Sequence, residues 1–110
     1  MKTWRKIGLI VVSLCLALPA AVVYGAEKKE SEGAKLFQQH CASCHPGGGN
    51  IINAAFTLHK KDRDAHGVKT AKDIIGKMRN PGPGMPRFDA KTITDKDANA
   101  IAGYILKTFK

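Results

Sequence analysis

Cys41-Ala42-Ser43-Cys44-His45 is the stretch of this sequence that decides the fold. Two thiols separated by two residues can form thioethers with the two vinyl groups along one porphyrin edge, and the adjacent imidazole then falls beneath the iron. The motif therefore predicts one haem c, attached through Cys41 and Cys44, with His45 as an axial ligand. A redox-active dithiol, a zinc half-site and a structural disulfide are the competing interpretations. A dithiol is expected between a strand and a helix and zinc needs further ligands, so haem attachment is favoured.

The segment from Asn80 to Phe88, NPGPGMPRF, contains three prolines and two glycines and therefore predicts a shaped loop. Met85 lies between Gly84 and Pro86, where a loop can present a thioether to iron from outside a helix. We expect Met85 to be the second axial ligand, the alternative being a loop methionine that packs as a core filler. Met78 lies on an apolar helical stripe and is expected in the core.

The sixth ligand separates electron transfer from haem chemistry, because an open position admits oxygen or peroxide. A site closed by Met85 predicts an electron carrier and not an enzyme. The alternative is a gas sensor or peroxidase-like enzyme with a dissociable Met85, for which Arg87 is the obvious distal group. Three histidines are weaker alternatives as ligands, one too close to the motif and two in a lysine-rich, solvent-facing segment: His40, His59 and His66.

Residues 1–25 are predicted to be a cleaved secretory signal, because three basic residues precede an apolar run from Ile7 to about Ala21. That run is too short for a good membrane span. Cleavage is expected after Gly25, or alternatively after Ala26. Cys15 follows a leucine instead of the small residue that lipid attachment requires, which disfavours a lipid anchor. Residues 26–110 are then a single domain that resides in the periplasm, or in the thylakoid lumen if the chain is photosynthetic.

The length and net charge of the mature chain indicate a need for a cofactor and the class of its binding partners. Removal of the signal leaves 85 of the 110 residues, which is little for burying a core without a cofactor or other staple. It also leaves 15 basic and nine acidic residues, a formal charge of +6. This charge favours redox proteins with acidic docking surfaces, while export argues against nucleic acid. We expect a monomer, oriented by cations around the exposed haem edge, with Lys77, Arg79 and Arg87 as candidates.

The periodicity of apolar residues predicts an all-α fold, and no segment alternates like a strand. Ser31, Thr70 and Thr94 are suited to cap helices. Ala98, Ile101, Ala102, Ile105 and Phe109 recur at the spacing of a buried helical face. The expected helices are residues 32–40, a weaker one at about 53–66, one from Thr70 through about Arg79, and a last one that opens at Thr94.

The motifs together resemble the class I cytochromes c, and most closely the small cytochrome c6 type that can replace plastocyanin in photosynthetic electron transfer. The matching stretches run in order through nearly all of residues 26–110: GAKLFQQHCASCH at 33–45, PGGGNIINAAFTLHK at 46–60, GMPRF at 84–88 and DANAIAGYIL at 97–106. The sequence departs from the photosynthetic pattern at Asp89, Ala90 and Phe56. A respiratory role and a subunit of a larger oxidoreductase therefore stay open alternatives.

The resemblance implies about four helices around one haem, with His45 and Met85 as axial ligands and one haem edge exposed. It also implies that Gly33 and Phe37 on the first helix meet Tyr104 on the last. Asn50 matches a position close to the haem and is a candidate neighbour of the cofactor. The pairing of histidine with methionine implies a comparatively high reduction potential.

Overall fold

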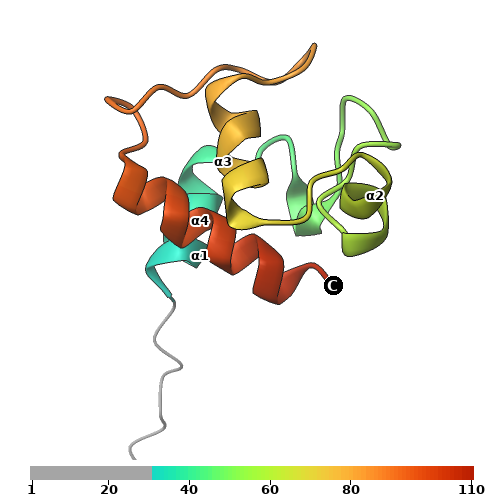
Figure 1. The fold of residues 1–110 in the computed structure, drawn as a ribbon, viewed down its shortest axis with the longest axis horizontal. Coiled ribbons are helices and arrows are strands. Elements are labelled where there is room, and N and C mark those ends of the chain that lie inside the picture. The colour runs from blue at the N-terminus through green and yellow to red at the C-terminus, as the bar shows by residue number, and fades with distance from the viewer. Residues whose placement is uncertain (1–30) are drawn as a thin grey trace, which may run out of the picture.

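The computed structural model describes residues 31–110, and the predicted signal at residues 1–25 lies outside them. Helices joined by loops make up the fold, and residues 31–110 contain no strand (Figure 1). This confirms the predicted all-α class. The elements in chain order are α1 (Glu32–His40), a short 3₁₀ turn η1 (Pro46–Gly48), α2 (Lys60–Ala65), α3 (Ala71–Arg79) and α4 (Asp95–Thr108).

The three longer helices begin at the predicted caps. The Ser31 and Thr94 hydroxyl oxygens each accept the backbone N–H of the residue three positions on, at 3.2 Å. Thr70 does the same for Asp73, whose carboxylate in turn accepts the Thr70 N–H and completes a capping box. Each cap satisfies donors that the first turn of a helix leaves free. These helix starts follow from local sequence alone.

Helices α1 and α4 cross at closest approach near Gly33 (Figure 1). A Cβ atom at this glycine would lie 2.1 Å from the Ala100 carbonyl oxygen, so only glycine permits the crossing. Phe37 on the same face of α1 is 1% exposed, and its ring centroid lies 5.2 Å from that of Tyr104. The expected contact of Gly33 and Phe37 with Tyr104 is confirmed.

The core lies where α1 and α3 pack on α4. Met78 of α3 is 3% exposed, which confirms its expected place in the core. The predicted apolar face of α4 is buried over its whole length, including Phe109 at its C-terminal cap. This core occupies one side of the molecule and leaves the far side of α1 and α3 to be covered by loops.

The expected helix at 53–66 is wrong over its first half. Residues 53–59 form an irregular loop, and α2 begins only at Lys60. Asn50 and Asn53 side chains accept the backbone N–H groups of residues 52, 53 and 55, and this bonding competes with a helical ladder. Local side-chain bonding therefore shortens the helix.

Arg63 is a buried cation on α2 whose role the sequence did not reveal. It is 5% exposed; its Nε donates to the Leu58 carbonyl at 2.7 Å and its Nη2 to the Phe109 carbonyl at 3.1 Å. The guanidinium thus donates hydrogen bonds to two carbonyl groups that would otherwise be buried without a partner. In this way α2 is fastened to the C-terminal end of α4.

Candidate haem site

A cavity of about 480 Å³ opens beside the core. Its walls come from the turn after α1, the loop before α2, one side of α3 and the loop from Gly82 to Phe88. All five residues predicted to hold or neighbour a cofactor line it: Cys41, Cys44, His45, Asn50 and Met85. Residues that lie far apart in the sequence thus meet around one space, although the roles of these five residues stay predictions.

The His45 imidazole is oriented by a single hydrogen bond. Its Nδ1 lies 2.7 Å from the carbonyl oxygen of Gly49. A carbonyl can only accept, so Nδ1 carries the proton and Nε2 keeps its lone pair for a metal. The sequence alone does not identify this partner of His45, and the structure identifies it as Gly49.

The turn that carries the cysteines continues directly from α1. Cys41 caps the helix by donating its N–H to the Phe37 carbonyl at 2.8 Å, and the N–H groups of Cys44 and His45 both donate to the Cys41 carbonyl. No disulfide joins the two cysteines, and burial raises the pKa of the Cys41 thiol to about 11. A redox-active dithiol needs a lowered thiol pKa, so this environment disfavours that interpretation.

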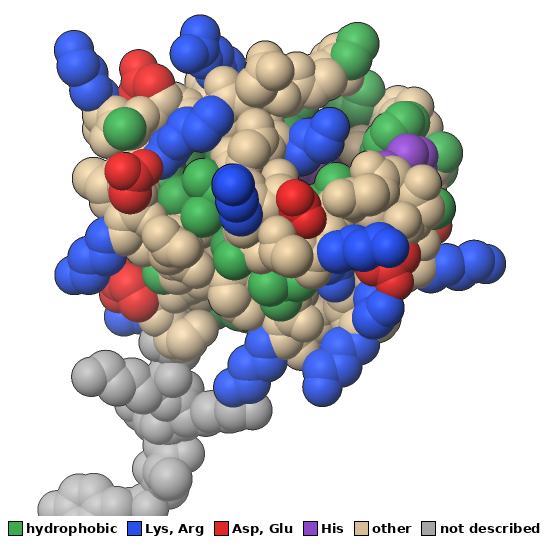
Figure 2. Space-filling model, in the orientation of Figure 1, with side chains coloured by type: hydrophobic (Ala, Val, Ile, Leu, Met, Phe, Trp, Pro, Cys, Tyr) green, Lys and Arg blue, Asp and Glu red, His purple; other side chains and the backbone are tan. Residues whose placement is uncertain are grey.

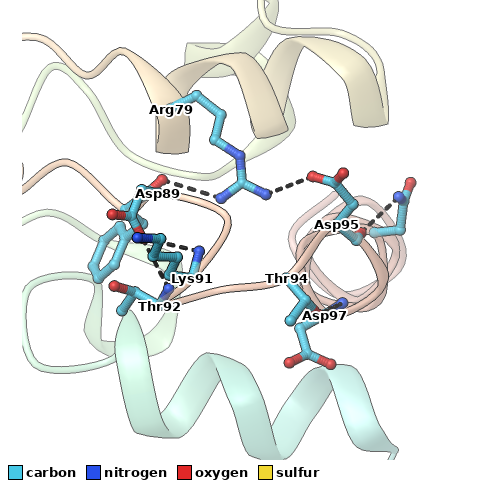
Figure 3. A network of polar contacts seen from close by, with 9 residues as sticks. Arg79, Asp89, Lys91, Thr92, Thr94, Asp95 and Asp97 are labelled. Atoms are coloured by element: carbon cyan, nitrogen blue, oxygen red, sulfur yellow. Dashed lines mark hydrogen bonds and ion pairs between the residues drawn. The ribbon is translucent and has the colours of Figure 1, made fainter.

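The loop that carries Met85 is closed at its base by the backbone of Phe88. The Phe88 N–H donates to the Met78 carbonyl at 2.9 Å, and the Phe88 carbonyl accepts from Arg79 Nη1 at 3.1 Å. The same guanidinium donates through Nη2 to Asp95 at 2.8 Å and so joins the end of α3 to the start of α4 (Figure 3). Both ends of the methionine loop are therefore anchored.

This geometry corrects one expectation. Arg79 is not free to orient a partner, because its guanidinium is taken up by Phe88 and Asp95 (Figure 3). Lys77 lines the cavity. Lys77 and Arg87 are both exposed, and neither takes part in an ion pair among residues 31–110. Of the three candidate cations, Lys77 and Arg87 thus stay available.

Asn50 reaches the cavity wall, but its hydrogen bonds go to its own loop. Its Oδ1 accepts the N–H groups of Ile52 and Asn53 at 2.9 and 2.8 Å, and its Nδ2 donates to the Phe56 carbonyl at 2.9 Å. The side chain shapes the loop before α2. Its role as a neighbour of the cofactor stays a prediction.

The other histidines differ in their relation to the cavity. His59 is exposed, does not line the cavity and packs edge-on against Phe109. His40 lines the cavity and lies edge-on to Phe88. His66 is exposed as expected, yet it also lines the cavity and stacks on Phe56 with ring centroids 4.1 Å apart. Phe56 and His66 lie ten positions apart on either side of α2, and no pattern in the sequence predicted their contact.

The donor set fits an iron porphyrin and disfavours zinc. Within residues 31–110, no group of three or more His, Cys, Asp or Glu side chains is arranged to bind a metal ion. The cavity is instead lined by the thiols of Cys41 and Cys44, the imidazole of His45 and the thioether of Met85. Apolar side chains such as Leu58 and Ile105 line it as well. A large, flat, apolar group that brings its own four ligands matches this arrangement.

Comparison with known proteins decides the family. The family model described as "Cytochrome C oxidase, cbb3-type, subunit III" matches residues 28–105. Cytochrome c6 of Microcystis aeruginosa is 37% identical over 68% of this chain and 91% of its own length. The chain belongs to the class I cytochromes c, and within them to the cytochrome c6 type. Cytochrome c6 of Thermosynechococcus vestitus is 33% identical over 96% of this chain and 90% of its own length.

The solved structures agree with this membership. OmcF, an outer membrane cytochrome F from Geobacter sulfurreducens, is 44% identical to this cytochrome with a TM-score of 0.69, over 71% of this chain and 99% of that chain. The predicted class I fold is thereby confirmed, and so are a single covalent c-type haem and a role in electron transfer, not enzyme catalysis. In the part of the cytochrome that the structure describes, no helix is long and apolar enough to cross a bilayer.

Proposed function

We propose that this cytochrome is a periplasmic one-electron carrier whose haem is attached through Cys41 and Cys44 and ligated by His45 and Met85. One observation carries the proposal. The four side chains line a single cavity, and the hydrogen bond from His45 Nδ1 to Gly49 leaves Nε2 as the metal-binding nitrogen. The export signal predicted at residues 1–25 supports the periplasm, with a thylakoid lumen as the equivalent compartment in a photosynthetic cell.

The chain's contribution to electron transfer is a fixed ligand geometry. When bound, the haem supplies an iron that alternates between the ferrous and ferric states. The Gly49 carbonyl holds the His45 ring in one tautomer, and Arg79 with the Phe88 backbone anchors the loop that presents Met85. A thioether ligand favours ferrous iron and raises the reduction potential. Side chains held in this way would move little when a bound iron gains or loses an electron.

The rim of the cavity supports docking of an acidic redox partner. Three large apolar side chains of the loop before α2 are exposed: Ile51, Ile52 and Phe56. On the face of the molecule drawn in Figure 2, hydrophobic side chains reach the surface where this loop approaches the methionine loop. Over the rest of this face, Lys and Arg side chains outnumber those of Asp and Glu. Lys77 and Arg87 are the available cations nearby. An apolar contact on a face with more basic than acidic side chains suits brief, electrostatically steered encounters.

A role as a subunit of a larger oxidoreductase is the second candidate. The name of the matching family model, an oxidase subunit, favours it. The two candidates differ in whether the cytochrome purifies alone or with a membrane complex after gentle solubilisation. Recovery as a monomer that exchanges electrons with separate partners supports the free carrier.

Replacement of Met85 by leucine, with Met78→Leu as the comparison, tests the assignment of Met85 as an iron ligand. Ferric haem bound by a thioether has a weak far-red absorption band. Met85→Leu keeps an apolar side chain of similar volume and should abolish this band. Met78→Leu is the matched control and should retain it, because Met78 is 3% exposed in the core. Survival of the band in Met85→Leu would refute the assignment.

A further inference from the structure

The Asn50 side chain is nearly saturated by bonds to its own loop. Three of the four hydrogen bonds that an amide can make are present, to Ile52, Asn53 and Phe56. Two N–H donors face Oδ1 and one carbonyl faces Nδ2, so the opposite amide orientation would set like groups against each other. These bonds close residues 50–56 into one turn.

Burial does not hold this turn in place. Ile51, Ile52 and Phe56 are 64%, 61% and 49% exposed. The turn begins at a backbone bond from the Ile51 N–H to the Cys44 carbonyl at 3.0 Å and ends at the stack of Phe56 on His66. Between these two anchors, the side-chain amides of Asn50 and Asn53 fix the path of the backbone, and Asn50 makes three of their four bonds.

The turn contacts the loop that carries Met85. A Cβ atom built on Gly84 would lie 2.9 Å from Cγ2 of Ile52, so the Ile52 side chain rests against the bare backbone of Gly84. Gly84 has a φ of +89°, a conformation that favours glycine, and it directly precedes Met85. Residues on both sides of this contact line the same cavity.

We infer that Asn50 is a positioning residue for Met85, because it holds Ile52 against Gly84 and so restrains the methionine loop. The inference rests on the proposed ligation by Met85. The turn thereby acts as a latch on this loop, in addition to the bonds at the loop's base through Phe88 and Arg79 and the partial packing of Met85 against the core. Release of the latch lets Met85 leave the iron more often without breaking up the helical core.

Two variants test the latch in the haem-loaded protein. Asn50→Ala removes the three hydrogen bonds, and Ile52→Ala removes the contact with Gly84 while keeping them. Asn99→Ala is the control, because its amide donates one bond, to the Asp95 carbonyl on α4 at 2.8 Å, and does not line the cavity. The readouts are carbon monoxide binding to the ferrous protein, the pH at which the ferric far-red band is lost, and amide exchange of residues 50–57 and 82–88.

Asn50→Ala should bind carbon monoxide about tenfold faster, which corresponds to about 1.4 kcal/mol. Ile52→Ala should change in the same direction, and the double variant should not exceed the larger single effect. Both should lose the far-red band at a lower pH and exchange faster at residues 82–88, whereas Asn99→Ala should not. Ile52→Ala decides the matter if Asn50→Ala fails to fold, since Ile52 is largely exposed.

The outcomes separate this inference from the proposed ligation. A wild-type protein without the far-red band overturns the assignment of Met85, and the latch with it. A wild-type protein with the band, together with unchanged carbon monoxide binding and loop exchange in both variants, overturns the latch alone.

Discussion

Gly48, in the short turn that follows His45, shows how one position can depend on the absence of a side chain. It is buried with a φ of +82°, and a Cβ atom there would lie 2.5 Å from Cδ1 of Phe109. Gly48→Ala should lower the free energy of unfolding by about 2 kcal/mol or more, from backbone strain and overpacking together. Urea denaturation of the haem-loaded protein measures this.

Gly76→Ala is the control for that experiment. Gly76 lies on α3, and no other atom lies within 4 Å of the position that a Cβ atom would take there. Alanine should therefore raise stability by roughly 0.5–1 kcal/mol through helix propensity. Equal effects of the two substitutions would contradict the packing argument.

Asp73 links stability to pH through the capping box of α3. The backbone and side chain of Thr70 and the backbone of Lys69 hold the pKa of its carboxyl below the ordinary value of 3.8. A lowered folded-state pKa stabilises the protein above that ordinary value, and the contribution is lost as the pH falls through the folded-state pKa. Asp73→Asn should therefore lose less stability than the wild type between pH 5 and about pH 2. Identical acid profiles from urea denaturation would argue against this linkage.

The residues of the site differ in how far the sequence could predict them. Cys41, Cys44 and His45 form a contiguous motif, and Met85 stands out in a loop rich in proline, so their chemistry is local. Arg63 has an ordinary setting of charged neighbours, and one of its carbonyl partners is 46 residues away in the chain. Only the folded chain reveals why that cation is buried.

At the scale of elements, the crossing of α1 and α4 depends on Gly33. A Cβ atom there would lie 2.1 Å from the Ala100 carbonyl oxygen and 2.9 Å from Cβ of Tyr104, both on α4. Backbone cannot move aside as a flexible side chain can, so Gly33→Ala should cost about 3 kcal/mol and lower the thermal midpoint. Gly103→Ala is the matched control on α4, because nothing lies within 4 Å of its Cβ position. If Gly33→Ala left the thermal midpoint unchanged, α1 and α4 could move apart without loss of free energy of unfolding.

The helices also show where local sequence rules stop. Ser31, Thr70 and Thr94 cap the three longer helices as predicted, because a hydroxyl needs only the N–H three residues on. The helix expected at 53–66 is loop over its first half because side-chain amides bond the backbone there, and their bonding depends on where the turn after Cys44 places Asn50. Capping is local, whereas the path of this loop depends on contacts across the cavity.

At the scale of the whole molecule, the cavity is large for so small a chain. Helices α1, α3 and α4 share one core, while loops and α2 enclose about 480 Å³ on its other side. Without a bound group this space is open to water, so the apolar side chains that line it would stay hydrated instead of buried. The covalent haem therefore completes the core as well as carrying the electron.

Removal of the haem attachment tests this dependence. The double variant with Cys41→Ala and Cys44→Ala should be exported without a tethered haem and should lose its cooperative thermal transition and near-ultraviolet circular dichroism, while keeping part of its helical signal. Ser43→Ala lies between the two cysteines and is exposed, so it should keep both the haem and the transition. A sharp transition in the double variant would show that the helices form a stable core by themselves. Loss of the transition in the double variant, but not in Ser43→Ala, would mean that the core of the fold depends on the same attached haem that carries the electron.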